Sequence, residues 1–235
     1  MYLIITTRCN MKCPHCWLDA TAEGEDMSWE IFKAALKLNH WSFVLGGGEP
    51  TLHPEFSRFL DYALEALDQQ GCIQVVTNGT QTQTAMELAR LTRLWKRDRY
   101  FQAALSYDAA HDLDMVSAEV VEEFRRLDAL SNAFIDDEGF YSPPYAQGRA
   151  LLNYDFLKYE CVLPEPVVWP RGEVTFCGCD KSPVIGHVLD EDFDVDDDDE
   201  ESSCCYWYQE PKPLSLEEID IFVSEAVGWK GSERT

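Results

Sequence analysis

Hydrophobic residues in the first 130 positions follow two alternating periods. Short apolar runs predict strands over residues 2–6, 41–45, 73–76 and 101–105. Segments with helical spacing follow these runs: one begins at Ser28, flanked by the hydrophobic pair Met27 and Phe32, and the others cover residues 56–67, 82–95 and 116–130. Because parallel strands require crossover connections, this alternation predicts a parallel sheet with helices packed outside it.

Polar or glycine-rich segments follow all four predicted strands. They are the cysteine-containing loop after residue 6, and residues 46–50, 77–79 and 106–108. In parallel sheets the active site lies at the carboxyl ends of the strands. We therefore expect the four segments to meet at one rim and to form the functional site.

The alternation of strands and helices stops after residue 130. Residues 134–135 are the candidate start of a fifth strand, and Ser142-Pro143-Pro144 interrupts regular structure. A complete further βαβ unit does not fit before Cys161. The expected fold class is therefore α/β, with a partial (β/α) barrel that is clipped after its fourth helix.

The remainder of the chain has a different composition. From about residue 154 it is rich in loop-forming residues and cysteine, and residues 190–201 are strongly acidic. Ser215 and Glu218 form a capping box for a final helix, whose apolar face comprises Leu216, Ile219, Phe222, Val223 and Ala226. We therefore divide the chain into a partial barrel over residues 1–153 and a small cysteine-rich extension over residues 154–235.

Composition and charge narrow the class of protein. Of 235 residues, 46% are hydrophobic and 12% aromatic, which suffices for a sizeable core and argues against a disordered chain. No apolar run approaches the roughly 18 residues of a membrane span, and the start lacks a basic signal region, so we expect a cytoplasmic protein without membrane contact. A net charge of −24 disfavours free nucleic acid as a partner, because binding phosphates relies on Lys and Arg.

Nine cysteines in a reducing compartment favour metal binding or redox chemistry over disulfides. Three of them, Cys9, Cys13 and Cys16, have the spacing C-x3-C-x2-C. Three thiolates this close can hold a cubane cluster and leave its fourth iron without a protein ligand. Two alternatives remain: a zinc site, which usually takes four ligands, and a thiol–disulfide motif, which leaves Cys9 without a purpose.

The cysteine loop between two strands, followed by Gly46-Gly47-Gly48-Glu49-Pro50 at the next strand end, resembles the radical S-adenosylmethionine (SAM) superfamily over about residues 1–150. The resemblance implies an enzyme in which a reduced [4Fe-4S] cluster transfers one electron to SAM. SAM is then cleaved to methionine and a 5′-deoxyadenosyl radical, which abstracts a substrate hydrogen. It also implies an electron donor such as flavodoxin or ferredoxin.

The resemblance assigns roles to individual residues. Cys9, Cys13 and Cys16 would bind three irons, and His15, at a position that is usually aromatic, would lie by the adenine. The methionine amino group would be received by the Gly46, Gly47 and Gly48 backbone and by Glu49. The ribose and carboxylate would be held by the polar strand-end residues Thr77, Asn78, Ser106 and Asp108. A late segment near the cofactor corresponds to Gln147-Gly148-Arg149, and thus to Arg149.

Each of these positions also has a purely structural explanation. Three glycines after a strand can serve a tight turn, and Asn78-Gly79 is common in turns. Ser106 and Asp108 can cap the following helix. His111-Asp112 is either a proton-donor pair or a helix start, and Arg149 has many acidic residues available as partners.

A second group of cysteines lies near the C-terminus. The spacing Cys161-x10-Gly172-x4-Cys177 resembles the start of SPASM and twitch extensions, and this resemblance implies an auxiliary iron–sulfur cluster. A hairpin with glycine at its turn would bring the two cysteines together. Cys179 with Cys204 or Cys205 would complete four ligands. Structural zinc is the alternative, and Cys72, alone in a strand pattern, suits a small buried hydrophobe.

The substrate class stays open between a peptide that is modified or crosslinked and a small-molecule or nucleotide-derived metabolite, since twitch-type relatives act on both kinds. An activase that places a glycyl radical on a partner protein is a third possibility. A non-catalytic zinc or iron–sulfur binding module is a fourth.

Overall fold

The computed structural model describes residues 1–38, 42–66, 71–95, 100–134, 142–145, 147–155, 157, 163 and 165–195. Its centre is a parallel sheet of five strands, in which strands that are consecutive in the sequence lie next to each other. These strands are β1 (Tyr2–Thr6), β2 (Ser42–Gly47), β3 (Cys72–Thr77), β4 (Phe101–Ser106) and β5 (Leu130–Ser131). All four expected strands are therefore confirmed, and β2 extends two residues further than predicted, into the glycine run.

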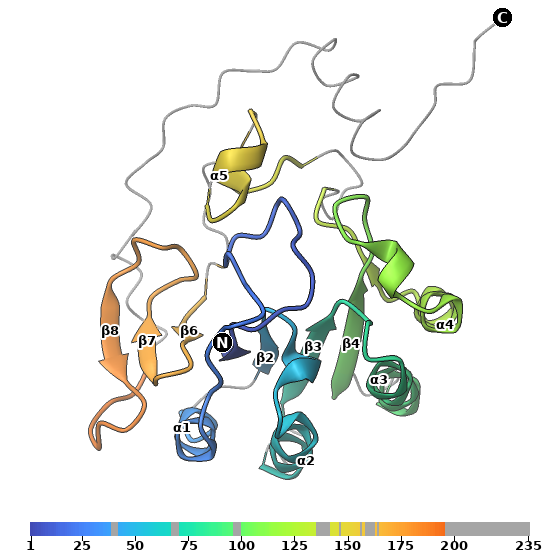
Figure 1. The fold of residues 1–235 in the computed structure, drawn as a ribbon. Helices are drawn as coiled ribbons and strands as arrows, with labels where there is room; N and C mark the ends of the chain where they lie inside the picture. Colours follow the sequence, from blue (N-terminus) through green and yellow to red (C-terminus); the bar gives the residue numbers. More distant parts are fainter. Residues whose placement is uncertain are drawn as a thin grey trace, which may run out of the picture.

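The main helices cover one face of this sheet (Figure 1). They are α1 (Trp29–Ala35), α2 (Phe56–Ala66), α3 (Thr82–Trp95) and α4 (Ala118–Leu127), with short 3-10 helices at Pro50–Leu52 and Leu113–Met115. Alternate strand residues are buried together with helix residues in one core, as the crossover argument requires. Those from the strands are Leu3, Ile5, Phe43, Leu45, Ile73, Val75, Phe101, Ala103 and Leu105.

The start of α1 is determined locally. The Ser28 side chain accepts a hydrogen bond from the Ile31 backbone N–H at 3.3 Å, which satisfies one of the amides left free at the helix start. Met27 and Phe32 are both buried in the core, as the predicted hydrophobic pair requires.

The prediction for the region after residue 127 is wrong in two respects. Helix α4 ends at Leu127, because Asp128 adopts the left-handed conformation with φ 58° and ψ 45°, which closes the helix. The fifth strand is then Leu130–Ser131, paired in parallel with β4, instead of residues 134–135. Phe134 is buried but lies in no strand, and Ile135 lies outside the described residues.

The extension continues the same sheet on the other side of β1. Strand β6 (Val167–Val168) pairs in parallel with β1, and the antiparallel strands β7 (Glu173–Thr175) and β8 (Val184–His187) follow. Gly172, with φ +99°, lies in the turn between β6 and β7, which confirms the predicted glycine hairpin. Helix α5 (Ala150–Asn153) precedes this part. Cys161, Cys204, Cys205 and the predicted C-terminal helix lie outside the described residues, and the boundary at residue 153 stays a prediction.

Candidate active site

The carboxyl ends of the first four strands enclose a cavity of about 490 Å³. Of the residues predicted for the first cluster and SAM, all but Gly46 line it: Cys9, Cys13, His15, Cys16, Gly47, Gly48, Glu49, Thr77, Asn78, Ser106, Asp108 and Arg149. Gly46 lies beside it, where a Cβ atom would come within 2.0 Å of the Tyr2 hydroxyl. The predicted convergence of four strand ends on one rim is therefore what the structure shows.

The three cysteines of the first loop share this cavity. Cys13 is buried, and the Cys9 sulfur accepts a hydrogen bond from the Met11 N–H at 3.4 Å. Burial raises the pKa of the Cys9 thiol to about 11, with Glu49 and the other two cysteines adding to the effect. A thiol with a raised pKa becomes a thiolate when a metal binds it, so Cys9, with two further cysteines in the same cavity, fits a metal cluster.

The number of thiols in this loop bears on the choice between a cluster and zinc. Three thiolates that line one cavity can bind three irons of a cubane cluster, whereas zinc usually takes four protein ligands.

Glu49 is fully buried and joins the ends of β2 and β3. Its Oε1 accepts hydrogen bonds from the Thr77 hydroxyl at 2.7 Å and from the Thr51 hydroxyl at 2.5 Å and backbone N–H at 3.1 Å. Its Oε2 accepts from the Asn78 N–H at 2.6 Å. Burial raises the pKa of this carboxyl, although the four hydrogen bonds oppose the rise. Each carboxylate oxygen has two lone pairs, and Oε2 accepts one hydrogen bond among the described residues, so it retains one position for a ligand.

The glycine run allows two stretches of backbone to approach closely. A Cβ atom on Gly47, whose φ is +134°, would lie 2.1 Å from the Thr6 carbonyl oxygen, and one on Gly48 would lie 2.3 Å from the Arg8 carbonyl oxygen. The backbone N–H groups of Gly48 and Glu49 donate to these same two carbonyls at 2.9 and 2.8 Å. The glycines therefore permit this close approach and do not form a tight turn, since Gly46 and Gly47 belong to β2. The Gly48 and Glu49 amides join the glycine loop to the start of the cysteine loop.

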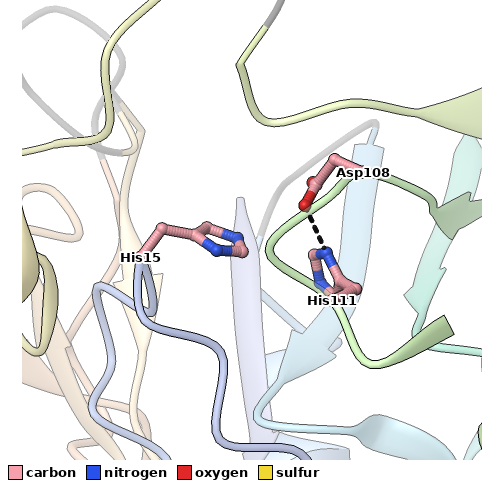
Figure 2. A group of neighbouring side chains, drawn as sticks. All are labelled: His15, Asp108 and His111. Atoms are coloured by element: carbon pink, nitrogen blue, oxygen red, sulfur yellow. Dashed lines mark hydrogen bonds and ion pairs between the residues drawn. The ribbon is translucent and has the colours of Figure 1, made fainter. Parts of the chain in front are cut away.

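Figure 2 shows a cluster of His15, Asp108 and His111 beside the cysteine loop. Asp108 Oδ1 accepts hydrogen bonds from His111 Nδ1 and from the Ala110 N–H, both at 2.9 Å, and Oδ2 accepts from the Ala133 N–H at 3.2 Å. The partner of His111 is thus Asp108, and Asp112 is the N-cap residue of the 3-10 helix Leu113–Met115, so of the two explanations for His111-Asp112 the helix start is the one that the structure shows. Asp108 also holds the turn after β4, but it caps no helix, because the following helices have Asp112 and Ser117 at their starts.

The pKa values of the two histidines in this cluster are shifted in opposite directions. Burial disfavours charge on His111, but its hydrogen bonds to Asp108 and Cys13 outweigh burial and raise its pKa to about 10. Burial lowers the pKa of His15 to about 4, so His15 is neutral. Its Nδ1 atom is buried without a hydrogen-bond partner among the described residues. Such an unsatisfied polar atom facing the cavity suits a ligand that supplies the missing hydrogen bond.

Arg149 is hydrogen-bonded to the backbone of the cysteine loop. Its guanidinium donates to the carbonyl oxygens of Cys13 at 3.1 Å and Ala20 at 2.9 Å, and its backbone N–H donates to the Cys16 carbonyl at 3.0 Å. Gly148 has φ +57° and packs so closely that a Cβ atom would lie 2.4 Å from the Trp17 carbonyl oxygen. Arg149 therefore lines the cavity while shaping the loop that carries the cysteines.

We expect Arg149→Leu to loosen the cysteine loop, because it removes two charge-assisted hydrogen bonds that are each worth roughly 1.5–3 kcal/mol. The variant should lose cluster iron to a chelator at least about tenfold faster than the wild type. Iron release can be followed by absorbance in anaerobic protein. Arg90→Leu, on the exposed surface of α3, is the matched control and should leave the rate unchanged. Equal rates in both variants would contradict a supporting role for Arg149.

The second cysteine group is described only in part. Cys177 is buried and Cys179 half-buried in the loop after β7, whereas Cys161 and Cys204 lie outside the described residues. The Gln147 side chain donates to the Gly178 carbonyl at 3.0 Å. The segment before α5, which supports the first cysteine loop, therefore also contacts the residue between Cys177 and Cys179. Cys72 is half-buried at the start of β3, and burial raises the pKa of its thiol.

A parallel sheet that gathers three cysteines and polar strand ends into one cavity defines a metalloenzyme with a partial (β/α) barrel. The chain belongs to the Radical SAM superfamily, whose family model matches residues 3–135. It is accordingly an enzyme of the kind that uses a [4Fe-4S] cluster and SAM, and such enzymes need a reductant and a substrate. No helix among the described residues has the length and apolar character to cross a membrane.

Two curated relatives are similar to part of the chain. The antilisterial bacteriocin subtilosin biosynthesis protein AlbA of Bacillus subtilis (strain 168) is 32% identical over 126 residues, which cover 52% of this chain and 25% of AlbA. The tungsten-containing aldehyde ferredoxin oxidoreductase cofactor-modifying protein of Pyrococcus furiosus is 35% identical over 100 residues, which cover 39% of this chain and 27% of the relative. The match thus spans about a quarter of each relative's length.

Among solved structures, Streptococcus suis SuiB bound to S-adenosylmethionine resembles the chain. The TM-score is 0.30 and the sequence identity 13%, over 78% of this chain and 62% of SuiB.

Proposed function

We propose that the chain binds SAM above Cys9, Cys13 and Cys16 and cleaves it reductively to start a radical reaction on a substrate. The observation that supports this most directly is the single cavity lined by the three cysteines, Glu49 and the polar ends of β3 and β4. When bound, the cluster supplies one electron to SAM, which yields a 5′-deoxyadenosyl radical that takes hydrogen from the substrate.

The chain's own residues would position the reactants and exclude water. Arg149 holds the cysteine loop in shape through backbone carbonyls, and Glu49 fixes the distance between the glycine loop and β3. The open acceptor position on Glu49 Oε2 is suited to the methionine amino group, a charge-assisted contact. His15, neutral and with a free ring nitrogen, is suited to the adenine edge, and Ser106 and Asp108 are suited to the ribose.

For the substrate we propose a peptide that is modified or crosslinked. AlbA, a bacteriocin biosynthesis protein, supports this class, whereas the cofactor-modifying protein of Pyrococcus furiosus supports a small molecule as the alternative. A glycyl-radical activase remains the third candidate, distinguished by a requirement for a large partner protein. The electron would come from a flavodoxin or ferredoxin in the cytoplasm.

We also propose that Cys161, Cys177, Cys179 and Cys204 hold an auxiliary iron–sulfur cluster. The glycine hairpin between β6 and β7 and the buried Cys177 thiol support this proposal. Structural zinc is the alternative occupant.

Glu49→Gln tests the cofactor site. The amide NH2 would replace one of the two oxygens and so face either the Thr77 hydroxyl or the Asn78 N–H, and the substitution would remove the charge that attracts the amino group, an effect of roughly 1.5–3 kcal/mol. We expect SAM affinity to fall by about one to two orders of magnitude while the cluster spectrum without SAM persists. Titration of SAM against the cluster signal measures this. Glu87→Gln, on the exposed face of α3, should bind SAM normally. An unchanged affinity in Glu49→Gln would leave this residue a purely structural role.

A further inference from the structure

The face of the sheet opposite α1 to α4 presents polar side chains near its centre. Successive strand residues point to opposite faces, and in β3 the buried Ile73 and Val75 belong to the core beneath the helices. Gln74, between them, points to the other face and is exposed, although β3 is flanked by β2 and β4. An exposed polar residue at the centre of a sheet indicates an open chamber on that face.

The strand register aligns Gln74 with side chains of three neighbouring strands. Tyr2 pairs with Val44, Val44 with Gln74, and Gln74 with Gln102. One row across β1 to β4 thus contains a phenol and two primary amides. We call Tyr2, Gln74 and Gln102 the amide row.

This row lies next to the active-site cavity. Tyr2 and Val76 line that cavity, and Val76 also lines a second cavity of about 520 Å³ that includes Gln74, Gln102 and Ala104. The side chains between the row and the rim are small or apolar, since Val76 pairs with Ala104. The two cavities therefore share Val76 in their linings, with Tyr2 in the first cavity and Gln74 and Gln102 in the second.

The charges of the two linings disfavour an anionic substrate. Arg149 is the one permanently cationic side chain among the described residues that line either cavity, and backbone carbonyls occupy its guanidinium. Asp128 in the second cavity adds negative charge. Among the described residues, a phosphorylated or nucleotide-derived metabolite would meet only Arg149 and the protonated His111, which are already paired with backbone carbonyls and with Asp108.

The amide row instead offers uncharged hydrogen-bonding groups. A glutamine side chain has one acceptor oxygen and two donor hydrogens, the pattern that peptide C=O and N–H groups require. One Gln74 donor is used by the Cys72 sulfur, which leaves the Gln74 oxygen and its second donor for a ligand. The Tyr2 oxygen accepts a hydrogen bond from the Gly47 N–H, so its own O–H is available to donate into the cavity. Burial raises the pKa of this phenol to about 12, so the donor keeps its proton.

We propose that the amide row binds the backbone of an extended, uncharged peptide segment of the substrate. One strand spacing of about 4.8 Å separates Gln74 from Gln102, and the Tyr2 hydroxyl lies nearer the rim, beside Gly46 and Gly47, so the three groups lead from the second cavity toward the first. The proposal rests on the radical SAM function and names the substrate class for that same site.

The test uses reconstituted full-length holoenzyme, saturated with SAM, and a pooled library of end-blocked, uncharged pentapeptides. Saturation-transfer NMR identifies the tightest library member, and calorimetry gives its Kd. We expect the double variant Gln74→Leu, Gln102→Leu to weaken that Kd at least tenfold, with iron content and SAM affinity retained. Gln83→Leu, on the exposed face of α3, is the matched control and should bind as the wild type does. A Kd unchanged by the double variant, or no binding to the wild type, overturns the proposal.

A photo-crosslinking residue at position 74 identifies the occupant of the chamber in the full chain. A crosslink to the library peptide supports the proposal, whereas a crosslink to residues 196–235 of the chain itself overturns it. Failure of the peptide proposal and failure of the enzyme assignment are distinguishable. Wild-type protein that cleaves SAM but ignores the library refutes only the former, and protein that binds no cluster or SAM refutes the latter.

Discussion

Anaerobically reconstituted wild-type protein is expected to cleave SAM to 5′-deoxyadenosine, and the triple variant Cys9→Ala, Cys13→Ala, Cys16→Ala is expected to form none. The three thiols line one cavity, and removing all of them would leave the proposed cluster without its thiolate ligands. The wild-type cluster spectrum should change when SAM is added, because the fourth iron would have no protein ligand. Electron paramagnetic resonance with and without SAM, together with product chromatography, measures both effects.

Cys72→Ala is the control for this experiment. Its thiol lies at the start of β3, at the opposite end of the strand from the cavity, so its removal should leave cluster and product formation intact. Deoxyadenosine formed by the triple variant would refute the assignment of the cluster. A wild-type cluster whose spectrum does not change on addition of SAM would show that SAM does not bind its fourth iron.

The pattern of apolar residues predicted the strands of the sheet well. Alternating apolar residues located β1 to β4 within one or two residues, because one face of each strand is buried under helices. The end of α4 was missed because helical spacing continues to Leu130. The helix stops where Asp128 takes a left-handed conformation, which aspartate adopts more readily than most residues but which no spacing reveals.

The candidate site was predictable as a location, whereas its internal contacts were not. The order of strands and helices places all carboxyl ends at one rim, so residues there could be named from the sequence. Which carboxylate pairs with His111, and that Arg149 donates to carbonyls of the cysteine loop, depend on side-chain packing between distant segments. Tyr2 was overlooked because it is the first residue of an apolar run, and only the register of β1 against β2 brings it under the glycine loop.

The second prediction with a large effect concerns the cysteines of the extension, and its measurement is the iron content. If Cys161, Cys177, Cys179 and Cys204 hold an auxiliary cluster, wild-type protein should contain about eight irons, two cubanes' worth. The triple variant of the first loop should retain about four. Its spectrum should not respond to SAM, because the protein would ligate every remaining iron.

Cys177→Ala is expected to remove the auxiliary cluster, keep the first one, and destabilise the fold. This thiol is buried beside β7, the Cys177 N–H donates to the Ser182 hydroxyl at 3.0 Å, and Gln147 connects the adjacent Gly178 to the segment that supports the first cysteine loop. The variant should therefore lose about four irons and melt at a lower temperature than Cys72→Ala, since metal binding supplies folding free energy. Zinc found by elemental analysis of protein from iron-replete cells would make the site structural. Complete iron loss in the triple variant would instead leave the first cluster as the sole one, because iron held by the extension would survive removal of Cys9, Cys13 and Cys16.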